Sequence, residues 1–405
     1  MTSRNDGTAT TAPNEHQPGP KRPLPNIAQL MLPDERAVRI TLITVVAVAV
    51  ALGASTLLVA ATGGSPGDAA QALYTGSISN ASAWSQTLDA SAPLLLVALG
   101  ACISNRAGVF NIGQEGQLLV GAGAACYVAL HLALPGALVM VLSLLAAALA
   151  GGLWSGASAV MNYTRGVNIV VSTLLMSFLG IELVSFAVSV PWLLQEPRAS
   201  ATSIASPESA QLPLGVRLPG FGNYPGLVIG GALVLSIVLT VLLATALGRS
   251  RWGFRLNMLG LNPMAARHAG VRASWLGGSA LMLSGAFAGL AGGAILMGSV
   301  FRLQPALSNN FGWDGLLVAL IARSRPAAAV PVALLFGALR SGSSFLASTG
   351  VPSYLVDVVQ SLLVLAFVVP PVLTKIRSRG RADVPEQPTA PVASGDAAPA
   401  QKVTA

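Results

Sequence analysis

Long runs of apolar residues, separated by short polar stretches, dominate the chain between residues 38 and 375. A helix that crosses a bilayer needs roughly 20 such residues, and several of the runs reach that length. The pattern predicts spans at 39–61, 89–104, 111–131, 134–155, 168–190, 225–248, 275–298, 311–322, 327–341 and 353–374. We therefore expect an all-α, polytopic membrane protein with about ten helices, some of them too short to cross alone.

The two ends of the chain have a different character. Residues 1–37 and 376–405 are polar and rich in proline and alanine, which predicts two disordered tails on either side of a membrane domain at 38–375. The first apolar run begins near Val38 and is longer than the apolar core of a signal peptide, so it predicts a retained anchor.

The basic residues predict an orientation. With the N-terminus inside, all but four of the 23 Lys and Arg residues fall in inside segments, as cytoplasmic loops require. The four outside residues are Arg198, Arg217, Arg302 and Arg340. Both termini are therefore predicted to be cytoplasmic. The longest outside segment, 192–224, is predicted to cover the outer mouth of the bundle or to contact a partner.

Composition agrees with a protein surrounded by membrane lipid. The chain is 53% hydrophobic and 9% charged, whereas soluble proteins carry about 25% charged residues. A net charge of +8 in a soluble domain would suggest nucleic acid, but here it reflects basic cytoplasmic loops, so no nucleic-acid partner is expected. Cys102 and Cys126 lie in apolar runs and are predicted to be buried free thiols.

Two short motifs resemble each other. "NIGQEGQLLV" at 111–120 and "NFGWDGLLV" at 310–318 both read Asn, apolar, Gly, any residue, acid, Gly, and then an apolar helix. In the predicted topology the first helix runs outward and the second inward. Opposed copies of this kind are typical of transporters with inverted repeats, in which the starts of broken helices line the substrate path.

Each acid in these motifs has two compatible interpretations. A carboxylate in lipid is costly unless it is paired or hydrated, so Glu115 is expected to face the protein interior. In the first interpretation Glu115 caps a packed helix that Asn111 also caps. In the second it lines a polar translocation path. A less favoured third interpretation is that it couples transport to a proton. Asp314 is a helix cap or an outer gate, and Trp313 packs or stacks on a planar ligand. The predicted path residues are Asn111, Gln114, Glu115, Gln117, Asn310, Trp313 and Asp314.

Two other segments carry recognisable patterns. Gly285, Gly289 and Gly293 recur every fourth residue, which gives one helix a bare face for close packing. The basic loop 249–274 contains Asn262-Pro263, a good helix start. The loop is predicted either to lie against anionic lipid or to present a short docking helix to a cytoplasmic partner.

The sequence also lacks several kinds of site. It has no G-x-x-x-x-G-K-[ST] motif, and its only lysines are Lys21, Lys375 and Lys402, so it has no P-loop for ATP. No metal-binding His/Cys cluster and no nucleophile elbow is present. The chain is thus not expected to be an enzyme, and ATP-driven transport would need an ATPase on another subunit.

Four stretches together resemble a known family. They are "RAGVFNIGQEGQLLVGA", "GFRLNMLGLNPMAARHAGV", "LSGAFAGLAGGA" and "FGWDGLLVALIARSRPAAAVPVALLFGALRSG". Over residues 38–375 the chain is similar to permease subunits of ABC importers for nucleosides, within a wider group of simple-sugar and branched-chain amino-acid permeases. In one place it departs from the group, because Ile169 and Ser177 stand where the family commonly has Glu and Asn.

The resemblance implies a plasma-membrane importer with two permease chains, identical or different. It also implies ATPase subunits and an extracytoplasmic substrate-binding lipoprotein, with ATP bound by the partner and no cofactor in this chain. The stretch "GLNPMAARHAG" resembles the family's ATPase coupling helix, a role that falls to Gly260, Asn262, Ala265, Ala266, Arg267 and Gly270. Two other hypotheses remain. The first is a self-sufficient transporter that couples uptake to protons through Glu115 or Glu182. The second is a scaffold with no role in transport.

Overall fold

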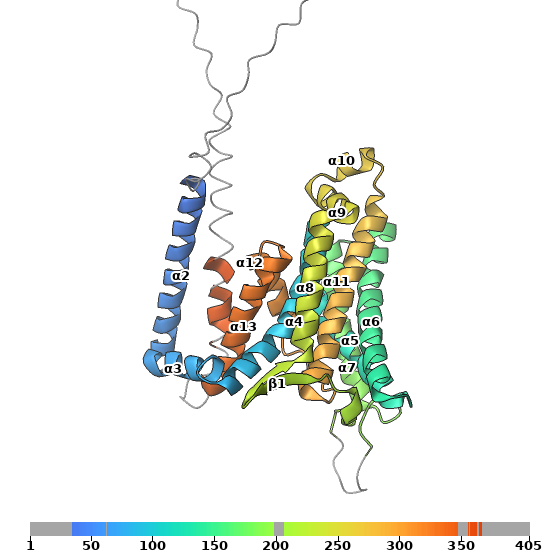
Figure 1. Ribbon diagram of the computed structural model, residues 1–405. Helices are drawn as coiled ribbons and strands as arrows, with labels where there is room; N and C mark the ends of the chain where they lie inside the picture. Colours follow the sequence, from blue (N-terminus) through green and yellow to red (C-terminus); the bar gives the residue numbers. More distant parts are fainter. Residues whose placement is uncertain are drawn as a thin grey trace, which may run out of the picture.

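The computed structural model describes residues 35–61, 63–197, 206–346, 355, 357–362 and 364–366. Helices dominate this part of the chain, as predicted (Figure 1). They are α2 (Glu35–Ala61), α3 (Pro66–Ser77), α4 (Ala81–Arg106), α5 (Gln114–His131), α6 (Gly136–Arg165), α7 (Ile169–Ser189), the 3₁₀ turn η1 (Leu214–Val216), α8 (Gly231–Arg249), α9 (Arg251–Leu261), α10 (Pro263–His268), α11 (Ala273–Ile295), the π-helical turn η2 (Leu296–Val300), α12 (Phe311–Ile321) and α13 (Pro326–Leu346). The predicted tails lie outside the described residues, except that α2 begins at Glu35.

Fewer helices are long enough to span a membrane than the sequence predicts. Within the described residues six qualify by length and hydropathy, namely α4, α6, α7, α8, α11 with η2, and α13. A seventh is added if α2 and α3, which are bent by 112° relative to each other, form one span. The predicted span 311–322 is the 11-residue α12, which rises only about 16 Å. The predicted span 353–374 lies largely outside the described residues.

Polar residues at helix starts hid two elements from the sequence pattern. Helix α4 begins at Ala81, eight residues before the predicted span, because the Asn80 side chain accepts the Ala83 N–H at 2.9 Å. Helix α3 was not predicted; it starts at Pro66 after a Ser65 cap. A small antiparallel hairpin, β1 (Gly220–Tyr224) and β2 (Leu227–Gly230), replaces the start of the predicted helix at 225–248.

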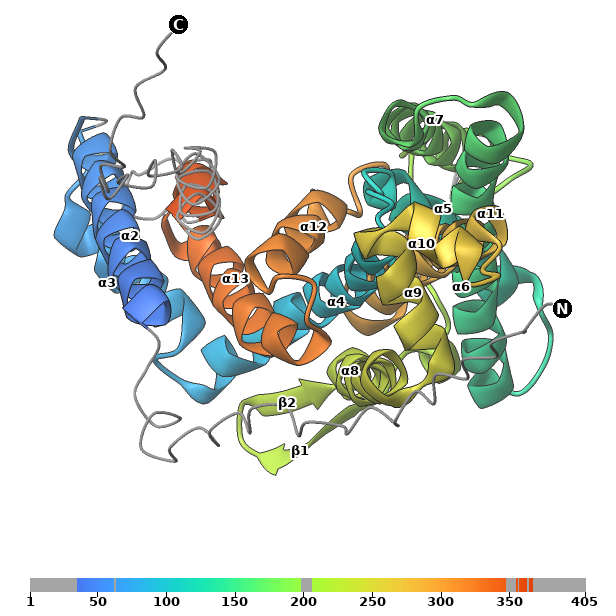
Figure 2. The same cartoon turned by 90° about the horizontal axis from the view of Figure 1, so that it is seen from above.

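Helices α4 and α11 form the centre of the molecule. The apolar window of α4 is 83% buried and that of α11 is 78% buried, whereas the other four spans reach 39% at most. Helix α4 packs on α12 and α13, and α11 packs on α5 and α6, so each central helix contacts the pair from the other half of the chain. Figure 2 shows α4 between α12 and α13 on one side and α5 on the other. That the two halves form an inverted repeat stays a prediction.

The glycine face of α11 allows this close packing, as predicted. A Cβ atom at Gly289 would meet the carbonyl oxygen of Ala147 in α6, and one at Gly285 would meet the carbonyl oxygen of Gly151. The backbones of α6 and α11 are thus in direct contact. Gly292, which the prediction did not name, makes the same kind of contact with Leu118 of α5.

The loops gather at two opposite ends. At one end are α9 and α10 (Figure 1), and Gly260 packs there against Arg106, whose Nε donates to the Ser324 carbonyl at 3.2 Å. At the other end the segment after residue 206 covers η2, with Leu212 N–H donating to the Phe301 carbonyl at 2.9 Å. That 192–224 covers the outer mouth of the bundle or contacts a partner stays a prediction. That the α9–α10 end faces the cytoplasm stays a prediction.

Candidate functional site

The first acid–glycine motif forms a closed polar cluster. Asn111 and Gln117 are completely buried, and each amide donates to the oxygen of the other, at 2.9 and 3.1 Å. Asn111 also donates to the Ser284 hydroxyl at 2.9 Å and accepts the Gly113 N–H at 3.0 Å. Helix α5 therefore starts at Gln114, three residues later than predicted, because the Asn111 side chain closes a turn before the helix.

Gln114 extends this cluster to the two central helices. Its amide donates to the Val97 carbonyl of α4 at 3.0 Å and to the Ser284 hydroxyl of α11 at 3.4 Å. Ser177, at one of the positions where the sequence departs from the family pattern, is also buried, and its hydroxyl accepts the Gly116 N–H at 3.4 Å. Ile169, the other such position, is the first residue of α7. The start of α5 is thus fixed by α4, α7 and α11 together.

Glu115 joins the two motifs. Its side chain is only 3% exposed, and its Oε2 accepts the N–H of Gly312 in the first turn of α12 at 2.7 Å. The carboxylate therefore caps α12 rather than its own helix, which corrects the predicted role. A negative charge is favourable there because the first N–H groups of a helix are unpaired and carry its positive end. Gly312 is required by this contact, since a Cβ atom would lie 2.5 Å from the Glu115 backbone.

The second motif is built around an ion pair. Arg340 of α13 donates from Nη1 to Oδ2 of Asp314 at 2.6 Å, and from Nη2 to the Asn309 carbonyl. Its guanidinium carbon lies 3.9 Å from the centre of the Phe311 ring. Asp314 is thus not a helix cap, contrary to one prediction. Arg340, predicted to lie in an outside segment, lies well inside α13, because that helix continues to Leu346.

The remaining predicted path residues are more open. Asn310 is exposed and Trp313 is half-buried, and neither side chain makes a hydrogen bond to any described residue. Glu182, the other acid of the proton-coupled alternative, is exposed on α7 and makes no side-chain hydrogen bond to a described residue. The seven predicted residues therefore form a sealed first group and a more accessible second group, joined by Glu115.

The predicted coupling segment folds as expected. Pro263 is the first residue of α10, and the Asn262 side chain accepts the N–H groups of Met264 and Ala265, both at 3.1 Å. Ala266 is completely buried, and Gly270 has a φ of +77°, which favours glycine. Ala265 and Arg267 are exposed. The predicted coupling residues thus divide into those that shape α10 and those that a partner can reach.

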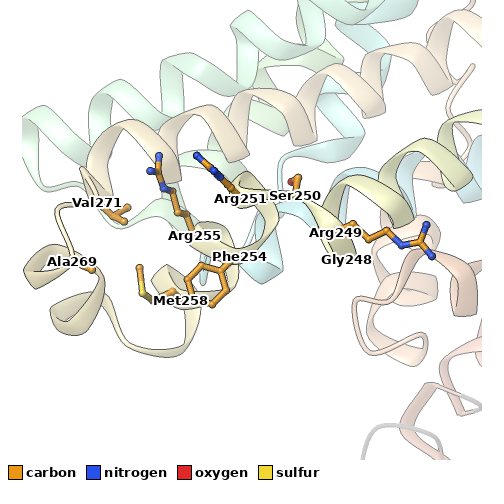
Figure 3. Close-up of a pocket in the computed structure, with 9 residues that line it drawn as sticks. All are labelled: Gly248, Arg249, Ser250, Arg251, Phe254, Arg255, Met258, Ala269 and Val271. Carbon is orange, nitrogen blue, oxygen red and sulfur yellow. The ribbon is translucent and has the colours of Figure 1, made fainter.

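The surface around α10 combines apolar and basic groups. Leu261 and Met264 are 80% and 62% exposed. Beside them is an open pocket of about 470 Å³, lined by Gly248, Arg249, Ser250, Arg251, Phe254, Arg255, Met258, Ala269 and Val271 (Figure 3). Arg251 and Arg255 project in the same direction in this view. Exposed apolar side chains next to arginines suit an acidic protein surface with an apolar centre.

Long apolar helices that bury a charged pair, Asp314 with Arg340, are typical of membrane proteins that move solutes. Comparison with known proteins makes this specific. The chain belongs to the family described as "Branched-chain amino acid transport system / permease component", which matches residues 84–368. This confirms the resemblance that the sequence motifs carry.

Relatives within this group differ in their named substrates. The chain is 32% identical to the glucose ABC transporter permease protein TsgB13 of Haloferax volcanii, over 74% of this chain and 80% of the relative. It is 28% identical to the guanosine ABC transporter permease protein NupP of Bacillus subtilis, over 84% and 97%. It is 25% identical to the nucleoside ABC transporter permease protein NupB of Lactococcus lactis, over 72% and 80%.

Family membership fixes the general role. The chain is a multi-pass permease subunit of an ABC transporter in the plasma membrane and not an enzyme with its own ATPase site. A permease of this family associates with an ATPase and a substrate-binding protein. Within the described residues, no group of His, Cys, Asp and Glu could hold a metal ion.

Sequence reasoning missed Arg340 as a site residue. The signal was present, because a charged residue inside an apolar helix of a membrane protein is by default a candidate functional group. It was overlooked because the predicted helix 327–341 ended beside it, which made Arg340 look like part of a loop.

One prediction concerns the coupling surface. Leu261→Asp combined with Met264→Asp is expected to lower co-purification of the ATPase about tenfold, because both exposed side chains offer apolar contact area and neither supports the fold of α10. Affinity purification of the tagged permease measures this. Leu214→Asp is the matched control, since Leu214 is 79% exposed at the opposite end of the molecule. Unchanged co-purification of the double variant would contradict a docking role. Ala266 is not a suitable position for this test, because it is buried and an arginine there would disturb the fold of α10 rather than its surface.

Proposed function

We propose that this chain is the membrane-spanning subunit of an ABC importer for nucleosides. A separate ATPase binds all the ATP, and this chain holds no cofactor. A second permease chain and an extracytoplasmic binding lipoprotein complete the importer. The similarity to permeases named for guanosine and nucleosides supports the substrate, since the guanosine permease matches over 97% of its own length.

The contact between Glu115 and Gly312 is the main support for the proposed mechanism. It joins the starts of two helices, α5 and α12, and Gln114 in the first turn of α5 also bonds to α4 and α11, the two most buried spans. Such helix starts line the substrate site in transporters that work by alternating access. We infer that α10 receives the movement of the ATPase and that α4 and α11 transmit it to these helix starts. Gly260 provides the first link, because it packs against Arg106 at the end of α4.

The same observation supports an ATP-driven importer over a proton-coupled one. Glu115 is buried and accepts a backbone N–H group, so in this state its carboxylate has a structural partner. A proton relay needs a carboxylate that can release and rebind a proton from water. Glu182 is exposed, but it lies on the surface of α7 among apolar residues such as Leu179 and Leu183.

Glucose is the second candidate substrate, because the permease named for glucose shares 32% identity with this chain. Uptake of labelled guanosine by cells that express the complete importer tests the choice. We expect unlabelled guanosine to abolish the uptake and a hundredfold excess of glucose to leave it unchanged. Uptake of labelled glucose, with no uptake of guanosine, would overturn the nucleoside assignment and favour the sugar.

A further inference from the structure

The ion pair at the start of α12 is held in a fixed geometry by three different contacts. The Arg340 guanidinium donates to the Asp314 carboxylate, donates to the Asn309 carbonyl, and lies over the Phe311 ring. Because these contacts come from three residues within the short segment Asn309–Asp314, the guanidinium has little freedom to rotate. Both charged side chains are partly accessible, with 16% of Arg340 and 13% of Asp314 exposed.

Several polar groups beside this pair have no protein partner. The Oδ2 atom of Asp314 is bound to Arg340, whereas its Oδ1 accepts no hydrogen bond from any described residue. The same holds, within the described part of the chain, for the indole N–H of Trp313 and the side-chain amide of Asn310. Asn310 is exposed and Trp313 is half-buried, so water can satisfy these two side chains. Asp314 is only 13% exposed, and polar groups inside a membrane protein are normally satisfied, so its open Oδ1 is the atom that points to a ligand.

The first motif provides the contrast within the same protein. In the related first stretch Asn111 and Gln117 bond to each other, and Asn111 and Gln114 donate to Ser284. All three side chains are shielded from solvent, and among their polar atoms only the Gln114 Oε1 has no partner within the described residues. The two copies of one motif have thus taken different roles. The first fixes the packing of the helices, and the second leaves its hydrogen-bonding groups available.

The charge around the pair indicates what kind of solute fits. Glu115 and Asp357 lie within electrostatic range of Arg340, in addition to Asp314. Only Asp314 contacts the guanidinium, but three carboxylates act on one positive charge, so the net charge of the region is negative and disfavours anions such as a phosphorylated solute. It favours a neutral molecule with hydroxyl donors. A carboxylate is a suitable acceptor for sugar hydroxyls, as it is for the ribose hydroxyl in dinucleotide-binding proteins.

We propose that Asp314, held in place by Arg340, binds the neighbouring hydroxyl groups of the sugar ring of the transported solute. This inference rests on the proposed transport of nucleosides, and it would also apply to glucose, because both solutes carry neighbouring ring hydroxyls. Asp314 is the recognition residue, and Arg340 is a positioning residue.

The test compares guanosine with 2′,3′-dideoxyguanosine, which lacks the two hydroxyls, in the complete importer. Asp314→Asn is expected to lower the uptake efficiency of guanosine by about tenfold or more and to change that of the dideoxy analogue less than twofold. Arg340→Gln is expected to act in the same direction, and Arg340→Lys to restore part of the discrimination. Equal losses for both solutes, or no loss for either, would overturn the proposal.

Arg217→Gln is the matched control. The Arg217 guanidinium also lies over an aromatic ring, Phe301 at 4.3 Å, and donates to a backbone carbonyl, that of Leu212, but it pairs with no carboxylate in the described structure. Loss of this arginine is expected to leave the preference for guanosine unchanged. If the unaltered importer takes up neither guanosine nor glucose, the proposed function itself is refuted rather than the assignment of Asp314.

A second measurement applies if Asp314→Asn does not assemble. Asn310→Cys places a thiol at an exposed position of the motif, while the native Cys102 and Cys126 are buried. Guanosine is expected to slow labelling of this thiol by a small thiol reagent in the reconstituted permease–ATPase complex, whereas the dideoxy analogue at equal concentration does not. Tyr224→Cys, at an exposed site on β1, is the control whose labelling neither solute changes. Equal protection by both solutes, or none by either while import is normal, would overturn the proposal.

Discussion

Replacing Gly289 by alanine is expected to destabilise the whole bundle, although it adds one methyl group. The new Cβ would meet the carbonyl oxygen of Ala147 and lie 3.2 Å from the Gly151 Cα, and both are backbone atoms of α6 that cannot rotate away. The two helices would have to separate along their shared face. Overpacking of this kind costs about 1–3 kcal/mol. We expect a lower thermal midpoint in detergent and less monodisperse protein, measured by size exclusion with a temperature ramp.

Gly278 on the same helix provides the control for that experiment. A Cβ atom there would lie 3.7 Å from the Tyr163 ring and 3.8 Å from the Ala159 Cβ, which are ordinary contacts. Gly278→Ala is therefore expected to leave the thermal midpoint nearly unchanged, and the slightly better helix propensity of alanine favours it. Equal behaviour of the two variants would show that the spacing between α6 and α11 is not set by the bare face of α11.

Replacing Glu115 by leucine is expected to reduce import by at least about tenfold. The change removes the acceptor of the Gly312 N–H and leaves that group buried without a partner, at a cost of about 1–3 kcal/mol. The start of α12 would then no longer be fixed to the start of α5. Because we attribute transport to coordinated movement of these helix starts, uptake should fall more than the amount of assembled complex does. Uptake normalised to complex in the membrane measures this.

Glu115→Gln separates the two roles that the sequence leaves open for this residue. Glutamine keeps an oxygen that accepts the Gly312 N–H but cannot carry and release a proton. The cap interpretation therefore predicts substantially more uptake for Glu115→Gln than for Glu115→Leu. If both variants are equally inactive while they assemble normally, the carboxylate acts through its charge or its proton, and the proton-coupled alternative gains support.

The sequence predicted what depends on local patterns. The apolar runs located the helices, Asn262-Pro263 predicted α10, and the glycine spacing in α11 predicted its contact face. These features follow from short stretches of chain. The starts of α3 and α4 were missed because their first turns are polar, so hydropathy does not mark them.

Roles that depend on distant partners could not be predicted. Both acids sit in the first turn of a helix, so local rules gave both the same role as caps of their own helices. In the structure Glu115 caps a helix almost 200 positions further on, and Asp314 pairs with an arginine of the next helix. In both cases the partner lies too far along the sequence for a short sequence pattern to reveal it. The similarity of the two motifs was informative, because it identified the two stretches that meet.

We propose that this permease has no energy source of its own. Uptake of labelled guanosine into proteoliposomes tests it most directly, with this permease reconstituted together with its second permease and binding protein, and with or without the ATPase. We predict uptake only when the ATPase and ATP are both present, and none in response to a pH gradient. Accumulation of guanosine by vesicles that lack the ATPase, driven by a proton gradient, would contradict the account.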